Sequence, residues 1–239
     1  MRLLPDFYQV GGPGMTCGND ATAFLLPAGE TLWMVDCGSL AGYDRLLENI
    51  AQCASGKKVS RIFGTHGHYD HLGAAARFRR DFGTQLFLHD ADKQQVESGD
   101  PVRTTAGLLY GKEFEACTVD APLRDRDTFT CDAGELTVLH TPGHTQGSVC
   151  LHLHHRCGMQ VLIAGDTLYG GSSPLIGSDE AAWRVSLDKL AGLHFDAFVF
   201  GHSKASLHCD ADRRLLDLRN QFGTYSSPWF KDFIHHYTY

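Results

Sequence analysis

The sequence predicts an α/β fold in which β-sheets are covered by helices on their outer faces. Short apolar runs typical of buried strands alternate with amphipathic stretches of helical spacing, and both halves of the chain show this alternation. The chain has 239 residues, of which 43% are hydrophobic, and no linker or low-complexity segment divides it. We therefore expect a single domain over residues 1–239, because this length is sufficient for one sizeable core.

In the first half, apolar runs alternate with one clearly amphipathic segment. The expected strands cover residues 31–36, 61–65 and 85–89, and the expected helices cover 43–54 and 74–82. The first helix is the clearest, because Leu46, Leu47 and Ile50 recur at helical spacing. Residues 90–134 predict one or two helices with connecting loops.

The second half repeats the alternation. The expected strands cover residues 136–140, 148–154, 160–166 and 196–200, and the expected helices cover 181–193 and 209–222. In the second of these strands, alternation places His152 and His154 on the outer face rather than in a metal site. The aromatic-rich end of the chain, residues 222–239, is expected to pack on the body or on a second subunit, which makes a homodimer possible.

The charge balance and the apolar content exclude several kinds of partner. The formal net charge of −7 argues against a nucleic-acid partner, since phosphate binding needs clustered Lys and Arg. The first ten residues do not resemble a signal peptide, and no run approaches the roughly 20 apolar residues of a membrane helix. Eight cysteines occur without a CxxC pair, which indicates reduced thiols. We expect a cytoplasmic protein that does not bind membranes and acts on a small molecule.

The segment THGHYDHLG, residues 65–73, holds four good metal-binding side chains within six positions. They follow directly on a predicted strand. In extended backbone His66, His68 and Asp70 would point to one side, and His71 would leave toward the other side near the start of a helix. One loop could therefore offer two adjacent sets of metal ligands.

Three further polar residues end apolar strands beside a glycine. They are His144 in TPGHTQGS, Asp166 in IAGDTLY and His202 in FVFGHS. Each strand end could bring its residue to a common rim. Imidazole and carboxylate ligands suit zinc, and the lack of a thiolate ligand leaves iron or manganese as alternatives.

The order HxHxDH, GH, GD, GH closely resembles the metallo-β-lactamase superfamily, and the resemblance extends from Asp36 to His202. It implies a four-layer αβ/βα sandwich with two metal ions, expected to be Zn²⁺, at one edge. It assigns His66, His68 and His144 to one ion, Asp70, His71 and His202 to the other, and Asp166 to both. Asp36, in VDCG, matches the family's acidic residue that orients a ligand from behind.

The resemblance also implies a reaction type. Two cations that share a water lower its pKa, so a metal-bridging hydroxide is expected to attack a carbonyl carbon. Asp70 could orient this hydroxide or shuttle its proton. Enzymes of the family that cleave β-lactams usually carry Cys or another residue at the position of Asp166, so this sequence is more similar to the branches with a bridging Asp. The expected substrate is a thioester or a lactone.

Two branches of the family remain open. THGHYDH, GHTQGS and GDTLY are most similar to glyoxalase II, although only 37 residues follow His202, where that enzyme has a helical glutathione-binding domain. Tyr169 lies three residues after Asp166, where the lactonases carry a Tyr that assists the ring oxygen, so Tyr169 is a candidate catalytic residue.

Alternative functions within the same fold are a metal-dependent oxidoreductase and a phosphodiesterase or nuclease. Persulfide dioxygenases do not use the Asp-His pair after HxH as ligands, whereas Asp70 and His71 are both present here. The nucleases usually carry further domains or an RNA-binding arm, and this chain is short and acidic. A metal-dependent hydrolase is the function that the sequence favours.

Overall fold

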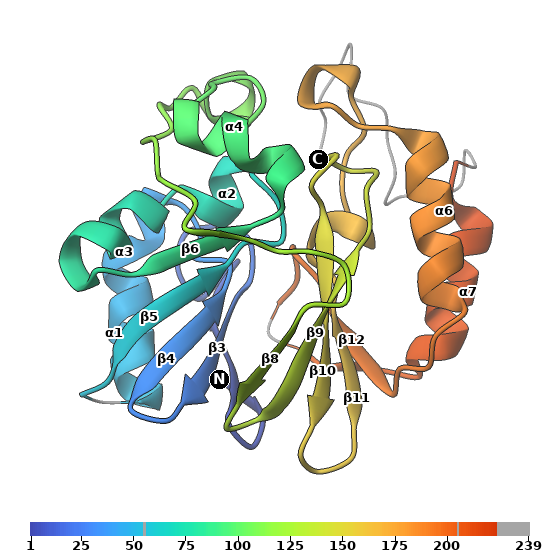
Figure 1. Cartoon of the computed structure of the whole chain (residues 1–239), viewed down its shortest axis with the longest axis horizontal. Coiled ribbons are helices and arrows are strands. Elements are labelled where there is room, and N and C mark those ends of the chain that lie inside the picture. The colour runs from blue at the N-terminus through green and yellow to red at the C-terminus, as the bar shows by residue number, and fades with distance from the viewer. Residues whose placement is uncertain (55, 205, 224–239) are drawn as a thin grey trace.

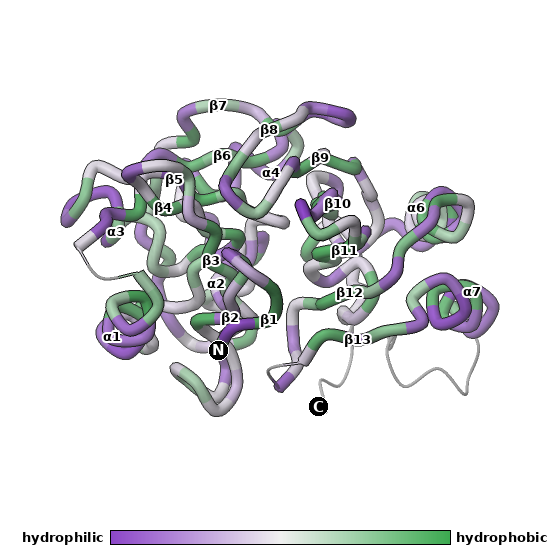
Figure 2. The backbone as a smooth tube through the Cα atoms, turned by 90° about the horizontal axis from the view of Figure 1, so that it is seen from below, coloured by the Kyte–Doolittle hydropathy of each residue, from purple (hydrophilic) through white to green (hydrophobic). Residues whose placement is uncertain are grey.

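The computed structural model describes residues 1–54, 56–204 and 206–223. Two β-sheets lie face to face, and helices cover the outer face of each sheet (Figure 1). Viewed from below, α1 and α3 lie on one outer side and α6 and α7 on the other (Figure 2). The predicted four-layer αβ/βα sandwich is confirmed.

The first sheet contains seven strands in chain order. They are β1 (Arg2–Leu4), β2 (Phe7–Gly11), β3 (Ala23–Ala28), β4 (Thr31–Val35), β5 (Lys58–Phe63), β6 (Gln85–Leu88) and β7 (Ala121–Pro122). The strands are antiparallel from β1 to β4 and parallel from β4 to β7. The helices of this half are α1 (Tyr43–Cys53), α2 (Tyr69–Leu72), α3 (Ala75–Phe82), α4 (Asp90–Ser98) and α5 (Ala106–Tyr110), with a 3₁₀ turn η1 (Leu40–Gly42).

The second sheet contains six strands in the order β13-β12-β11-β10-β9-β8. Their bounds are β8 (Thr128–Cys131), β9 (Gly134–His140), β10 (Val149–His155), β11 (Gln160–Ile163), β12 (Ala197–Val199) and β13 (His208–Cys209). Only the pair β11–β12 is parallel among the pairs described. The helices are α6 (Glu180–Ala191) and α7 (Ala211–Gln221), with 3₁₀ turns η2 (Gly165–Thr167) and η3 (Pro174–Ile176).

Three apolar clusters fill the spaces between the layers. Strand β4 is apolar after Thr31 because both of its faces are buried: Met34 packs toward α1 and α3, whereas Trp33 and Val35 face the second sheet. Phe63 of β5 joins Trp33 in this inner cluster. Trp183 of α6 is fully buried in the third cluster, against the outer face of the second sheet.

The structure differs from the sequence prediction at three places that matter for the site. The antiparallel strands β1, β2 and β3 were not predicted, and they complete the first sheet before the first predicted strand. Asp70 does not continue an extended segment, because the backbone after His68 turns into α2, where the Leu72 N–H donates to the His68 carbonyl. The strand predicted over 160–166 ends at Ile163, and Asp166 lies in η2.

The predicted packing of the aromatic end of the chain, and with it the homodimer, concerns mainly residues 224–239, which lie outside the described residues. None of the helices in the described ranges is long and apolar enough to cross a membrane.

Candidate metal centre

The seven residues predicted as metal ligands lie together at one edge of the sandwich. His66 and His68 follow β5, and Asp70 and His71 lie in α2. The other three follow strands of the second sheet: His144 comes after β9, Asp166 after β11 and His202 after β12. Six of the seven residues are buried, and the side chain of His202 is 21% exposed.

Three imidazole nitrogens converge in the first set. His68 Nδ1 lies 3.0 Å from His66 Nε2 and 3.0 Å from His144 Nε2. The His144 Nδ1–H donates to the Gly171 carbonyl at 2.8 Å, which leaves the Nε2 lone pair facing the centre. Three lone pairs that face one point cannot satisfy one another, whereas a cation at that point would satisfy all three.

Burial favours the neutral form of the histidines in the first set, which is the form that binds a metal. Burial lowers the pKa of His66 and of His68 well below the ordinary value, and the charges of neighbouring histidines lower both pKa values further. Burial also lowers the pKa of His144. Neutral imidazoles keep the lone pair that binds a metal.

The second set combines two histidines with a carboxylate. His202 Nε2 lies 3.1 Å from Asp70 Oδ2, and His71 Nε2 lies 3.8 Å from the same oxygen. Burial alone would raise the pKa of Asp70, but the charge of His71 and the hydrogen bond from His202 lower it to about 2. Burial alone would lower the pKa of His202, but Asp166 and Asp70 raise it to about 10.

The Asp166 carboxylate lies between the two sets. Its Oδ1 is 3.3 Å from His71 Nε2, and its Oδ2 is 3.3 Å from His202 Nε2 and 3.6 Å from His144 Nε2. Asp166 therefore contacts histidines of both sets.

The residues present fit divalent metal ions. Within the described residues, three overlapping groups each bring their donor atoms within 4.8 Å of one another: His66, His68 and His144; His66, His71 and Asp166; Asp70, His71 and His202. In addition, His71 Nε2 and Asp166 Oδ1 are buried atoms for which no hydrogen bond is found. Buried polar atoms of this kind need a partner, and imidazole and carboxylate ligands are typical of zinc.

Asp36 orients His71 through a hydrogen bond on the side of the ring that faces away from the other predicted ligands. The His71 Nδ1–H donates to Asp36 Oδ2 at 2.8 Å, which fixes the tautomer that turns Nε2 toward the centre. Thr65 donates twice to the same carboxylate, through its N–H to Oδ1 and through its hydroxyl to Oδ2, both at 2.8 Å. The Thr65 hydroxyl also lies 3.1 Å from His66 Nδ1, where its oxygen can accept the ring proton. The sequence analysis missed Thr65, although its place between β5 and the first histidine was a usable signal.

A cavity of about 410 Å³ opens beside the second set. Its lining residues are Pro13, Gly18, Asn19, Leu109, Tyr110, Tyr169 and His202. Tyr169, predicted as a catalytic residue, lines this cavity with its ring centroid 5.9 Å from that of His202. Burial and the charge of Asp166 raise the pKa of the Tyr169 phenol. No sequence signal pointed to Asn19, Leu109 or Tyr110, because the fold brings them to the site from distant segments.

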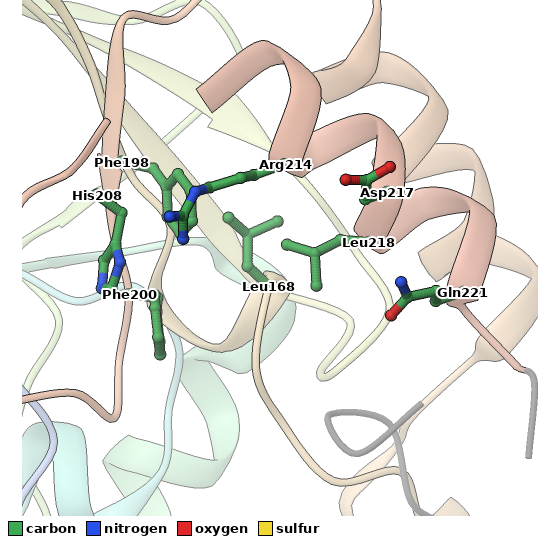
Figure 3. Close-up of a pocket in the computed structure, with 8 residues that line it drawn as sticks. All are labelled: Leu168, Phe198, Phe200, His208, Arg214, Asp217, Leu218 and Gln221. Atoms are coloured by element: carbon green, nitrogen blue, oxygen red, sulfur yellow. The ribbon is translucent and has the colours of Figure 1, made fainter. Parts of the chain in front are cut away.

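Two other features lie apart from the centre. The rings of His152 and His154 are 3.9 Å apart, and neither residue belongs to a group of donors described above. A second cavity of about 210 Å³ lies between α7 and the end of β12 (Figure 3). It is lined by Leu168, Phe198, Phe200, His208, Arg214, Asp217, Leu218 and Gln221, none of which is a predicted metal ligand.

Similarity to curated proteins extends over part of the chain. An uncharacterized protein of Aquifex aeolicus is 33% identical over 125 residues, which cover 52% of this chain and 56% of that protein. Human acyl-coenzyme A thioesterase MBLAC2 is 29% identical over 177 residues, which cover 65% of this chain and 61% of that protein. The chain thus spans less than two thirds of the length of these relatives.

Solved structures show the same fold at low sequence identity. BJP-1, a subclass B3 metallo-beta-lactamase of Bradyrhizobium japonicum, superposes with a TM-score of 0.75 at 20% identity, covering 93% of this chain and 89% of that one. The metallo-beta-lactamase GOB-18 of Elizabethkingia meningoseptica gives a TM-score of 0.74 at 20% identity, covering 93% and 88%. Residues 18–202 match the sequence profile of the Metallo-beta-lactamase superfamily, and this chain belongs to that superfamily.

Proposed function

We propose that the protein is a dinuclear metal-dependent hydrolase that cleaves a small carbonyl substrate, a thioester or a lactone. The observation that carries the proposal is the position of Asp166 between two complete sets of donors. In this proposal His66, His68 and His144 hold one ion, Asp70, His71 and His202 hold the other, and Asp166 bridges them. Zinc is the proposed metal, with iron or manganese as alternatives.

The chain's own residues prepare the site for hydrolysis. Two bound divalent ions would supply a hydroxide nucleophile and polarise the carbonyl group of the substrate. The Asp70 carboxylate, which faces the same donor group as His71 and His202, would orient the nucleophile or accept its proton. A phenol is protonated at neutral pH and burial raises the pKa of Tyr169 further, so this group can donate a hydrogen bond to the leaving oxygen or sulfur.

A thioester with an uncharged acyl group is the substrate that the cavity supports best. The cavity beside His202 has apolar and aromatic walls formed by Leu109, Tyr110 and Tyr169. Its lining, as far as the described residues form it, contains no Lys or Arg that would pair with an anionic acyl group. Independently of the cavity, the name of the human relative MBLAC2, an acyl-coenzyme A thioesterase, supports a thioester substrate.

The proposal is tested by comparing kcat/KM for three substrates on metal-replete protein: an acyl-coenzyme A thioester, a glutathione thioester and an acyl-homoserine lactone. We expect thioester hydrolysis that disappears when a chelator removes the ions and returns when zinc is added. A preference for the lactone would assign the site to the lactonase-like branch. Failure to cleave all three by protein that holds two ions would refute the proposed substrate class.

A further inference from the structure

A buried carboxylate on α4 joins two loops that come from opposite sheets. Asp92 lies in the first turn of α4 and is 1% exposed. Its Oδ2 accepts hydrogen bonds from the Gly67 N–H at 2.8 Å and from the Thr145 hydroxyl at 2.7 Å. Its Oδ1 accepts the Gly147 N–H at 2.9 Å. Three donors from outside the helix therefore converge on one side chain.

These donors flank the first set of metal ligands. Gly67 lies between His66 and His68 in the loop after β5, and Thr145 follows His144 in the loop after β9. Asp92 thus connects, through one carboxylate, the two loops that bring the three imidazole nitrogens together. Each loop belongs to a different half of the chain; the Val149 N–H also donates to the Thr65 carbonyl at 2.8 Å, so Asp92 adds a second link between them beside this backbone hydrogen bond.

The backbone of both loops is adapted to this contact. A Cβ atom on Gly147 would lie 2.6 Å from Asp92 Cγ, and one on Gly67 would overlap the Gln95 amide one turn further along α4. Only glycine lets the two backbones approach the helix this closely. The cost of burying a carboxylate is offset only when its oxygens are well supplied with hydrogen bonds, as they are here.

We propose that Asp92 is a positioning residue for the metal centre: it sets the distance between the His66–His68 loop and His144 and so preorganises the three-histidine site. The inference rests on the proposed metal-binding function of these histidines. It adds a residue that makes no contact with metal or substrate. Supporting residues behind metal ligands typically change metal affinity by about 10- to 100-fold when they are substituted.

The substitution Asp92→Asn tests the proposal with little change in size. An Asn amide has one acceptor oxygen, so its NH₂ group must face either the Gly147 N–H or the Gly67 N–H, and one loop loses its anchor. The matched control is Asp90→Asn, an exposed position in the same turn of α4. Both variants remove one negative charge, so a difference between them does not arise from net charge.

The measurement is a zinc titration of metal-free protein in competition with a chromophoric chelator, which gives the affinities of the two ions separately. We expect Asp92→Asn to weaken the binding of one ion by about 10- to 100-fold and to leave the affinity for the other ion unchanged. The Asp90→Asn variant should bind both ions with wild-type affinity. If Asp92→Asn does not fold, Thr145→Val removes one of the three hydrogen bonds, and a severalfold loss of affinity for the same ion is expected.

The outcomes separate the two proposals. If wild-type protein binds two zinc ions and the Asp92 variant, or Thr145→Val in its place, binds both equally well, the positioning role is overturned and the hydrolase proposal stands. If wild-type protein binds neither zinc nor iron nor manganese, both proposals are overturned together. Thermal unfolding of the metal-free variants provides a further check, because a purely structural role would lower the melting temperature without changing zinc affinity in the folded protein.

Discussion

Asp36 Oδ2 accepts a hydrogen bond of 2.8 Å from His71 Nδ1, although 35 positions of sequence separate the two residues. The bond holds the His71 ring in the tautomer whose Nε2 faces Asp70 and Asp166. We predict that Asp36→Asn weakens binding of the second ion by about 10- to 100-fold, since Asn has a single acceptor oxygen and either His71 or the Thr65 N–H then faces the amide NH₂. Zinc stoichiometry after dialysis against a chelator measures this, and two retained ions would contradict it.

Asp166→Ala removes the side chain that contacts both sets of donors. We expect the variant to lose the second ion and most of its hydrolytic activity, because the His71 and His202 nitrogens then lack their shared carboxylate. Metal content and kcat/KM of the same sample test this prediction. A variant that holds two ions tightly would exclude the bridging role.

Tyr169→Phe removes a phenol that lines the cavity and keeps the ring. If the phenol donates a hydrogen bond to the leaving atom, the rate of ester opening should fall at least about tenfold, the typical scale of general-acid assistance being larger still. Metal content should not change. An unchanged kcat at full metal content would remove Tyr169 from the mechanism.

Gly201→Ala probes the space behind the second set. A methyl group at Gly201 would overlap Asp166 Oδ1 and lie 3.0 Å from His71 Cε1, so both ligands would have to move. We expect loss of the second ion with little change in the fold. Gly192→Ala is the control, because a methyl group there meets its nearest atoms at 3.6 Å. Equal zinc affinity in the two variants would contradict the prediction.

His152 should make the protein sensitive to acid. Burial and the charge of His154 lower its pKa from 6.5 to about 4. Above pH 6.5 the imidazole of His152 is neutral in both the folded and the unfolded state. Between pH 6.5 and about 4, His152 is protonated in the unfolded state but not in the folded state. His152 therefore lowers the free energy of unfolding as the pH falls through this range. His152→Leu should lose less stability than wild type between pH 7.5 and 5 in urea unfolding, and identical losses would refute the prediction.

The predicted ligands converge in the structure because they all come after strands that end at the same edge of the sandwich. His144, Asp166 and His202 were found as polar residues that end apolar runs, and the structure places each of them after a strand of the second sheet. The extended conformation predicted at Asp70 was wrong. The chain turns into α2 there through backbone hydrogen bonds that the pattern of side chains does not indicate. Local periodicity also missed β2 and β3, whose pairing partners lie elsewhere in the sheet.

Most residues that support or surround the predicted ligands were not found in this way; Asp36 and Tyr169 were named only through the family resemblance. Asp92 contributes through three hydrogen bonds to donors 25 to 55 positions away, and nothing beside it in the sequence marks a site. Asn19, Tyr110 and Tyr169 reach one cavity from three separate segments. Such contacts are properties of the tertiary arrangement, and a single sequence does not encode them as a local pattern.

The division of the donors between the two sheets has a thermodynamic consequence. Four donors belong to the half that contains the first sheet and three to the half that contains the second, so an ion held by both halves acts as a crosslink between them. Because unfolding releases the crosslink, each tenfold rise in free ion above the dissociation constant would add about 1.4 kcal/mol to the stability of the folded chain. The supply of metal in its surroundings would then govern the lifetime of this protein as well as its chemistry.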